Sequence, residues 1–211
     1  ATPFTRMVDN YAAAGHYYLR KDAGWASFEK VLNELSKYDL VLANVVNMSR
    51  YASREFGVSD NAELFMTKLS TMKNAVLTVF GSPYSLEKFP GWKELIVAYE
   101  ETDMTQAITA QAIFGGRQVS GKLPVSAGEY HFGDGIATPP PTRLTYGSIE
   151  ELGYPSSTLA KVDSIIRATL SIEATPGCQV LAAKDGHVFY NKSFGNHTYD
   201  APSREVKNTD L

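Results

Sequence analysis

The sequence predicts an α/β fold: a parallel-sheet α/β sandwich with flavodoxin-like layers, followed by a linker and a partial α+β segment of one helix and one β-hairpin. Three observations lead to this prediction. Stretches with helical apolar spacing alternate with short continuous apolar runs through the first part of the chain. A proline-rich stretch then interrupts the pattern. After it come another amphipathic stretch and an Asp-Gly turn between two apolar runs.

The helices of the first part are predicted from apolar residues at helical spacing, with suitable residues at their ends. A hydroxyl followed by proline suits a helix N-terminus, and glycine ends helices because it accepts a left-handed backbone. The expected helices begin at Thr2-Pro3, at Trp25, at Asp60 with Glu63 as a capping-box-like pair, and at Asp103 as the cap of Met104–Phe114; they end at Gly15, Leu35, Met72 and Gly115-Gly116.

Four short runs in the first part are predicted strands. His16–Leu19 is aromatic and strand-like. Leu40–Val46, Ala75–Phe80 and Leu95–Tyr99 are continuous apolar runs, as is typical of strands that a parallel sheet buries on both faces. Repeated helix–strand units of this kind predict the parallel α/β sandwich.

The second part of the chain begins with a predicted linker over residues 136–147, because Pro139–Pro141 favours polyproline II and cannot continue a helix. Ser156 or Ser157 then caps an amphipathic helix, and Asp185-Gly186 forms a hairpin turn. The strands of this hairpin are expected at Cys178–Ala183 and His187–Tyr190. A helix and one hairpin bury little alone, so we expect this segment to dock on the first domain or on a missing remainder.

Composition excludes several classes of protein. The chain has 20 Lys+Arg against 23 Asp+Glu, a net charge of −3, and 44% hydrophobic residues. It can therefore bury a core, and it has no electrostatic footprint for nucleic acid or an anionic membrane. No apolar run approaches the roughly 20 residues of a membrane-spanning helix.

The single cysteine and the chain ends add two expectations. Cys178 cannot form an intrachain disulfide, and in its apolar run it is expected to be a buried packing residue. The chain starts at Ala1 without methionine and stops at Leu211 soon after the predicted hairpin. Both ends are therefore expected to be cut from a longer protein.

Three matches to the serine-hydrolase pattern Ser-x-x-Lys occur, at Ser27–Lys30, Ser70–Lys73 and Ser85–Lys88. The first two lie inside ordinary predicted helices, and no Tyr-x-Asn or Lys-Thr-Gly partner accompanies any of them. Chance matches of so short a pattern are common. Structural positions are favoured over a nucleophile, and no catalytic residue is expected in this chain.

Cofactor and metal sites are not expected either. Gly116–Lys122 nearly matches a phosphate-binding loop, but Leu123 stands where a hydroxyl must hold magnesium, and the motif follows a helix instead of a strand. A turn leading into an edge strand is predicted there. The histidines lack metal-ligand spacing to one another or to the cysteine; they are His16, His131, His187 and His197.

Three carboxylates follow the third predicted strand, where α/β sheets often hold ligands. They are Glu100, Glu101 and Asp103. A glycosidase pair must flank a sugar at about 5–10 Å, and sequence spacing does not supply that geometry. Asp103 is more simply a helix cap, and Glu101 is a first-turn carboxylate that the helix dipole favours.

One tract of the sequence resembles a known family. Ile96–Glu100, Ala107–Gly116 and Val119–Ser126 occur in the order found in the C-terminal α/β sandwich domain of family 3 glycoside hydrolases, with the phrase Ser-Gly-Lys-Leu-Pro-Val. The resemblance extends over residues 1–135 and is greatest to the β-N-acetylglucosaminidase type. In that subgroup a preceding barrel carries the nucleophilic Asp and a His-Asp acid/base pair. Nothing in this chain matches the barrel, so the resemblance implies a glycosidase parent whose catalytic groups lie elsewhere.

A second tract is similar to the N-terminal helix and first hairpin of serine β-lactamase-like hydrolases of the class C and penicillin-binding-protein kind. The matching segments are Leu144–Ser148, Leu159–Asp163, Thr175–Gly186 and Val188–Gly195. In that family a Ser-x-x-Lys nucleophile follows the hairpin, and this chain stops before one. Three parts are expected: the sandwich domain over 1–135, the linker over 136–147, and a truncated hydrolase domain over 148–211.

Together the resemblances imply the non-catalytic middle of a bacterial fusion of barrel, sandwich and serine hydrolase. The parent would act on glycans that contain N-acetylglucosamine, in the periplasm, at the cell envelope or outside the cell. The sandwich would buttress the barrel and could supply loops beyond its strands, with Asn47 and Ser82 as candidate substrate-binding residues, although plain turns explain both. The alternatives are an α/β ligand-binding or regulatory module without the resembled partners, and a serine hydrolase that uses an internal Ser-Lys pair.

Overall fold

The structure is a computed structural model that describes residues 1–210. Two compact units make up the chain. Unit 1 consists of Ala1–Thr5, Gly15–Thr109 and Val119–Thr138, and unit 2 of Arg6–Ala14, Ala110–Gln118 and the chain from Pro139 onward. Two short segments of the first predicted domain therefore belong to the second compact unit.

Unit 1 contains a parallel three-stranded sheet in the order β1-β2-β3. Its strands are β1 (Val41–Val45), β2 (Ala75–Val79) and β3 (Leu95–Val97). Val41 is in register with Ala75, and Val79 pairs with both Val45 and Val97. The sheet confirms the mixed α/β class and the three strands that the apolar runs predict, although every residue of β3 is only half-buried.

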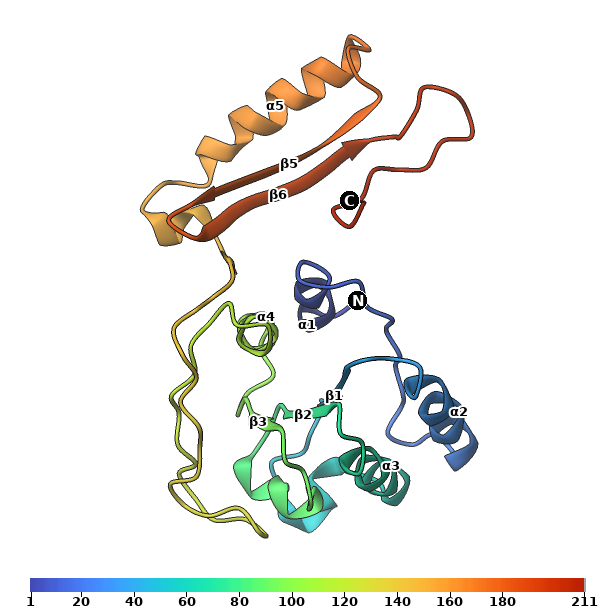
Figure 1. Ribbon diagram of the computed structural model, residues 1–211, viewed down its shortest axis with the longest axis vertical. Helices are drawn as coiled ribbons and strands as arrows, with labels where there is room; N and C mark the ends of the chain where they lie inside the picture. The colour runs from blue at the N-terminus through green and yellow to red at the C-terminus, as the bar shows by residue number, and fades with distance from the viewer. Residues whose placement is uncertain (211) are drawn as a thin grey trace. The chain divides into compact units, whose positions relative to one another are not determined.

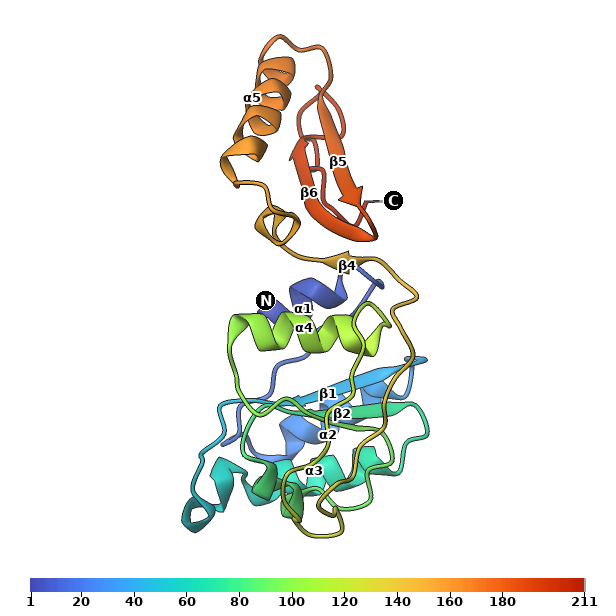
Figure 2. The ribbon, with the colours of Figure 1, turned by 90° about the vertical axis from the view of Figure 1, so that its left-hand side faces the viewer.

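Two helices pack on the same face of this sheet (Figures 1 and 2). They are α2 (Trp25–Leu35) and α3 (Asp60–Ser70). The rings of Phe28 and Phe65 join them, with centroids 5.2 Å apart. Leu77 and Val79 of β2 are fully buried under the same cluster. On the other side of β2, Phe4 of α1 (Pro3–Val8) meets Phe80 edge-on at 6.1 Å.

The predicted strand at His16–Leu19 is wrong, since these residues form no strand. Tyr17 and Tyr18 are exposed, and the Tyr17 hydroxyl makes a 3.0 Å hydrogen bond with the hydroxyl of Tyr38. Aromatic residues favour strands only where a neighbouring strand accepts them. Here side-chain contacts hold an extended segment, and its backbone joins neither sheet. The first helix also stops early, at Val8 instead of running to Gly15.

Two helix caps lie one residue before the predicted ones. The N-cap of α3 is Ser59, whose hydroxyl accepts a hydrogen bond from the Ala62 N–H at 3.3 Å. At α4 (Asp103–Ile113), the Thr102 hydroxyl accepts from the Thr105 N–H at 3.1 Å. The acidic residues that follow these hydroxyls occupy the first helical turn, where the positive end of the helix dipole favours them.

Unit 2 contains a mixed sheet in the order β4-β6-β5. The strands are β4 (Thr145–Tyr146), β5 (Gly177–Lys184) and β6 (His187–Gly195). The Asp185-Gly186 turn confirms the predicted hairpin, with φ of 53° and 80° as a two-residue primed turn requires. The helix α5 (Ser157–Ser171) lies along the hairpin with Ser156 at its N-cap (Figure 2).

Two expectations for this unit are wrong. Thr145 and Tyr146, inside the predicted linker, pair in parallel with His187 and Val188. They form β4 because a pairing edge of β6 is open to them. Cys178 is half-buried instead of buried, since β5 lies at the edge of its sheet. In unit 1, the segment after Gly121 was expected to be an edge strand and is irregular instead.

An ion pair and a hydrogen bond fix α5 to β6. The Tyr190 hydroxyl donates to the Asp163 carboxylate at 2.5 Å, and the Lys192 ammonium lies 2.8 Å from the same carboxylate. Burial, together with this carboxylate, raises the pKa of Tyr190 to about 12. Tyr190 is therefore a neutral donor at physiological pH.

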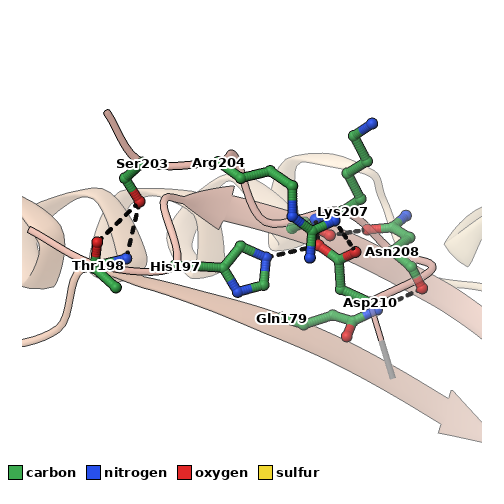
Figure 3. A network of polar contacts seen from close by, with 9 residues as sticks. Gln179, His197, Thr198, Ser203, Arg204, Lys207, Asn208 and Asp210 are labelled. Carbon is green, nitrogen blue, oxygen red and sulfur yellow. Dashed lines mark hydrogen bonds and ion pairs between the residues drawn. The ribbon is translucent and has the colours of Figure 1, made fainter. Parts of the chain in front are cut away.

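The segment after β6 turns back on itself around Asp210 (Figure 3). The Asp210 carboxylate accepts from the Lys207 backbone N–H at 2.7 Å and from Arg204 at 2.6 Å, and it lies 2.9 Å from His197 Nε2. The backbone N–H of Lys207 is the main cause that lowers the pKa of Asp210 to about 2, followed by His197 and Arg204.

Leu77→Ala tests the core of unit 1. Leu77 is fully buried, so the substitution leaves a cavity and should lower the free energy of unfolding by about 2–5 kcal/mol, measured by urea denaturation. Leu64→Ala is the matched control, because Leu64 is 46% exposed and should change the same quantity little. Equal losses in the two variants would contradict the packing described.

The Asp210 turn should respond to acid. The pKa of Asp210 is about 2, below the value of about 3.9 in an unfolded chain. Its stabilising effect is therefore complete above the unfolded value and is lost as the pH falls through about 2. The carboxyl-carbon NMR signal of Asp210 should titrate near pH 2, and Lys207→Ala, which keeps the backbone donor, should leave it low. A midpoint near the unfolded value would show that the turn is not formed.

Candidate functional site at the carboxyl edge of the parallel sheet

The candidate residues Asn47 and Ser82 lie at the same edge of the sheet. Asn47 follows β1, and Ser82 follows β2, so their loops leave the sheet together because the strands are parallel. Gly81 lies so close to Met48 that an added Cβ would come within 2.9 Å of its sulfur. The structure therefore brings the two predicted loops into contact.

The loop after β3 reaches the first of these loops. The backbone N–H of Asn47 donates to the Glu101 carboxylate at 2.5 Å. Asn47 has a φ of 55° and Tyr99 a φ of 59°, both in the left-handed region. The turn at Tyr99 also explains why β3 ends at Val97, before the predicted limit. The Glu101 carboxylate thus holds the Asn47 loop, and one of its oxygens is already occupied by the Asn47 N–H.

An ion-pair cluster also joins the loops after β1 and β2. These loops contain the short 3-10 helices η1 (Ala52–Gly57) and η2 (Pro83–Lys88). The Lys88 ammonium pairs with Glu55 of η1 and lies 3.5 Å from Glu63 of α3. The hydrogen bond to Glu55 is the main cause that raises the pKa of Lys88. The charged Lys88 side chain therefore links the loop after β2 to the loop after β1.

Strained backbone gathers at this edge. Glu55 and Phe56 have φ of 49° and 51°, in addition to Asn47 and Tyr99. Left-handed conformations cost non-glycine residues of order 1–3 kcal/mol each and persist where surrounding contacts impose them. Such residues concentrate at functional sites, so the carboxyl edge is the candidate site of unit 1.

Each of the three loops also carries an exposed tyrosine. Tyr51, Tyr84 and Tyr99 are 49%, 54% and 44% exposed. The guanidinium groups of Arg50 and Arg54 lie 5.2 and 5.6 Å from the centre of the Tyr51 ring. Exposed aromatic rings with hydrogen-bonding neighbours suit a ligand that has both apolar faces and hydroxyl groups. These tyrosines were not among the candidate residues predicted from the sequence, although each lies at the end of an apolar run or within five residues after it.

The two predicted site residues contribute differently. Asn47 is exposed, so its side-chain amide can reach a ligand. The Ser82 carbonyl accepts from the Ser85 hydroxyl at 2.7 Å and from its N–H at 3.0 Å, as expected of a residue that starts a turn of helix. The plain-turn interpretation therefore accounts for the backbone of Ser82. Glu100 and Asp103 are also exposed beside Glu101.

The Ser-Lys pairs do not form a catalytic arrangement in the described part of the chain. Ser85 is fully buried and donates to Ser82, while Lys88 is engaged by two glutamates. The Ser70 hydroxyl donates to the Thr67 carbonyl at 2.9 Å. Ser27 lies on the exposed side of α2. These hydroxyls have structural partners or face solvent.

The chain over residues 1–210 contains no group of three or more His, Cys, Asp or Glu side chains placed to hold a metal ion. None of its helices is both long enough and apolar enough to cross a membrane.

Comparisons with known proteins give no match. No protein-family model fits the chain, and neither the curated proteins nor the solved structures contain one with significant similarity to it.

Glu101→Ala should release the Asn47 loop. Without the carboxylate the Asn47 N–H loses its acceptor, so its amide hydrogen should exchange at least several-fold faster by NMR. Glu100→Ala is the matched control, since this neighbouring exposed carboxylate does not bond to Asn47. If both variants exchanged at the same rate, the Glu101 contact would not hold the loop.

Proposed function

We propose that the chain is the non-catalytic sandwich region of a glycoside hydrolase of the family 3 β-N-acetylglucosaminidase kind, joined to the start of a serine β-lactamase-like domain. The proposal also assigns each unit to a domain. Unit 1 would be the flavodoxin-like sandwich, and the hairpin of unit 2 would be the start of the serine β-lactamase-like domain. The sequence tracts Ile96–Gly116 and Val119–Ser126 support the first resemblance. The parallel sheet of unit 1 is compatible with it.

The carboxyl edge supplies the functional part of this proposal. Its three exposed tyrosines, one from each loop, are the observation that carries it. A sugar ring presents C–H faces that pack on aromatic rings and hydroxyl groups that need hydrogen-bonding partners. Asn47 and the exposed carboxylates of Glu100 and Asp103 can bond to such hydroxyls. We infer that this edge contacts glycans that contain N-acetylglucosamine.

The chain would hold the glycan without cleaving it. Cleavage needs one carboxylic acid and a second carboxylate on either side of the sugar bond. Glu101 already accepts the Asn47 N–H, and Glu55 is paired with Lys88. Both glutamates are also exposed. Cleavage therefore belongs to a barrel domain of the parent protein, which unit 1 would support.

The proposal predicts binding without hydrolysis. The full chain should not release chromophore from a chromogenic N-acetylglucosaminide. Titration with chitotriose should shift the NMR signals of Asn47 and of the loops that hold Tyr51, Tyr84 and Tyr99. Tyr84→Ala should weaken this binding by about fivefold or more, or about 1 kcal/mol, because the variant lacks the ring on which the sugar face packs.

Tyr199→Ala is the matched control, since Tyr199 is 59% exposed in unit 2 and should leave the affinity unchanged. Steady hydrolysis by the purified chain would overturn its non-catalytic role. Absence of chitotriose binding would overturn the glycan contact at the carboxyl edge.

A further inference from the structure

A hollow of about 610 Å³ lies in unit 2, and none of its lining residues belongs to the candidate site of unit 1. Its lining is Asn10, Tyr11, Pro141, Thr142, Arg143, Leu144 and Tyr146. All of these residues belong to unit 2, although Asn10 and Tyr11 are far from the others in sequence. Small-molecule sites commonly have volumes of about 300–1,000 Å³, so this hollow has room for one sugar-sized ligand.

A buried amide holds one wall of the hollow. Gln111 is 2% exposed, and its Oε1 accepts from the Tyr146 N–H at 2.7 Å. Its Nε2 donates to the Tyr146 carbonyl at 2.9 Å. The side chain therefore pairs with this residue as a neighbouring strand would, and it fixes the backbone at the end of β4. Such prior ordering lowers the entropy cost of binding.

The Tyr11 ring, which also lines the hollow, is fixed by its own contacts. The Tyr11 ring stacks on Phe114 with a centroid distance of 5.2 Å and meets Tyr146 edge-on at 5.2 Å. The Tyr11 hydroxyl donates to the Leu144 carbonyl at 2.6 Å. A Cβ on Gly116 would lie 2.3 Å from this hydroxyl, so a side chain at this position would displace the Tyr11 ring. Burial raises the pKa of Tyr11 to about 12, and the ring is therefore neutral.

The charged side chain that lines the hollow is positive. Arg143 is the charged residue in its lining, and its side chain has no acidic partner within residues 1–210. Arg117, which also influences the Tyr11 hydroxyl, is paired with Glu151 at 3.3 Å. The lining contains no carboxylate. A ligand that enters therefore meets an unpaired guanidinium, which favours a carboxylate.

We propose that this hollow binds a compact organic anion, a carboxylate carried on a hydroxylated ring, as in a hexuronate. The Arg143 guanidinium takes the carboxylate, the rings of Tyr11 and Tyr146 pack against the sugar ring, and the Thr142 hydroxyl bonds to a ring hydroxyl. The inference does not rest on the glycan contact proposed for unit 1, because no residue is shared.

Titration calorimetry of the full chain with D-glucuronate tests the proposal. Methyl D-glucuronate ester keeps the ring and removes the charge, and acetate keeps the charge and removes the ring. Glucuronate should bind about tenfold more tightly than either, since a charged hydrogen bond contributes about that much. NMR signals of Asn10, Tyr11 and Tyr146 should shift in the glucuronate titration.

Arg143→Gln should remove the preference for glucuronate over its ester, while Arg167→Gln, a change at an exposed arginine of α5 outside both sites, should keep it. Equal thermal midpoints show that both variants fold. Equal affinity for glucuronate and the ester would overturn the role of Arg143. Equal affinity for glucuronate and acetate would overturn the role of the rings, and an unchanged calorimetric trace with all three ligands would overturn the site.

Discussion

Burial of β2 between its two parallel neighbours is the constraint on which the rest of unit 1 depends. Leu77 and Val79 are fully buried, and they fix β2 against the cluster under α2 and α3. Because the three strands run in the same direction, their loops must leave at one edge. The Asn47–Glu101 hydrogen bond and the Lys88–Glu55 ion pair then act on loops that the sheet has already brought together. A change in the register of the three strands would separate these loops and break both contacts.

In unit 2 a single side chain has a comparable effect. Gln111 satisfies both backbone groups of Tyr146, which would otherwise lack a partner on that side of β4. This contact places Tyr146 beside Tyr11, and the Tyr11 hydroxyl in turn holds the Leu144 carbonyl. These hydrogen bonds fix the backbone of Leu144 and Tyr146, which lie in the predicted proline-rich linker. Proline content predicts how a segment behaves without tertiary contacts, and here such contacts determine its structure.

The sequence predicted the elements whose burial is continuous and local. The limits of α2 and the three parallel strands followed from apolar runs, and the Asp185-Gly186 hairpin followed from turn chemistry. The strand at His16–Leu19 failed because pairing depends on a distant partner. At the site, strand ends located Asn47 and Ser82, but the Glu101 contact joins residues 54 positions apart. The hollow was unpredictable for the same reason, since Asn10 and Tyr11 meet residues 141–146 only after folding.

The two sites differ in charge, and this difference separates the ligands that each can prefer. The carboxyl edge of unit 1 carries cations and anions together. Arg50 and Arg54 flank Tyr51, Glu100 is exposed on the loop after β3, and Asp103 is exposed at the first residue of α4. Mixed charges give little selection by net charge, so a neutral glycan that uses ring stacking and hydrogen bonds suits this edge. The hollow of unit 2 has a cation without a carboxylate in its lining. A neutral sugar there would leave the Arg143 charge unused, whereas an acidic sugar engages it.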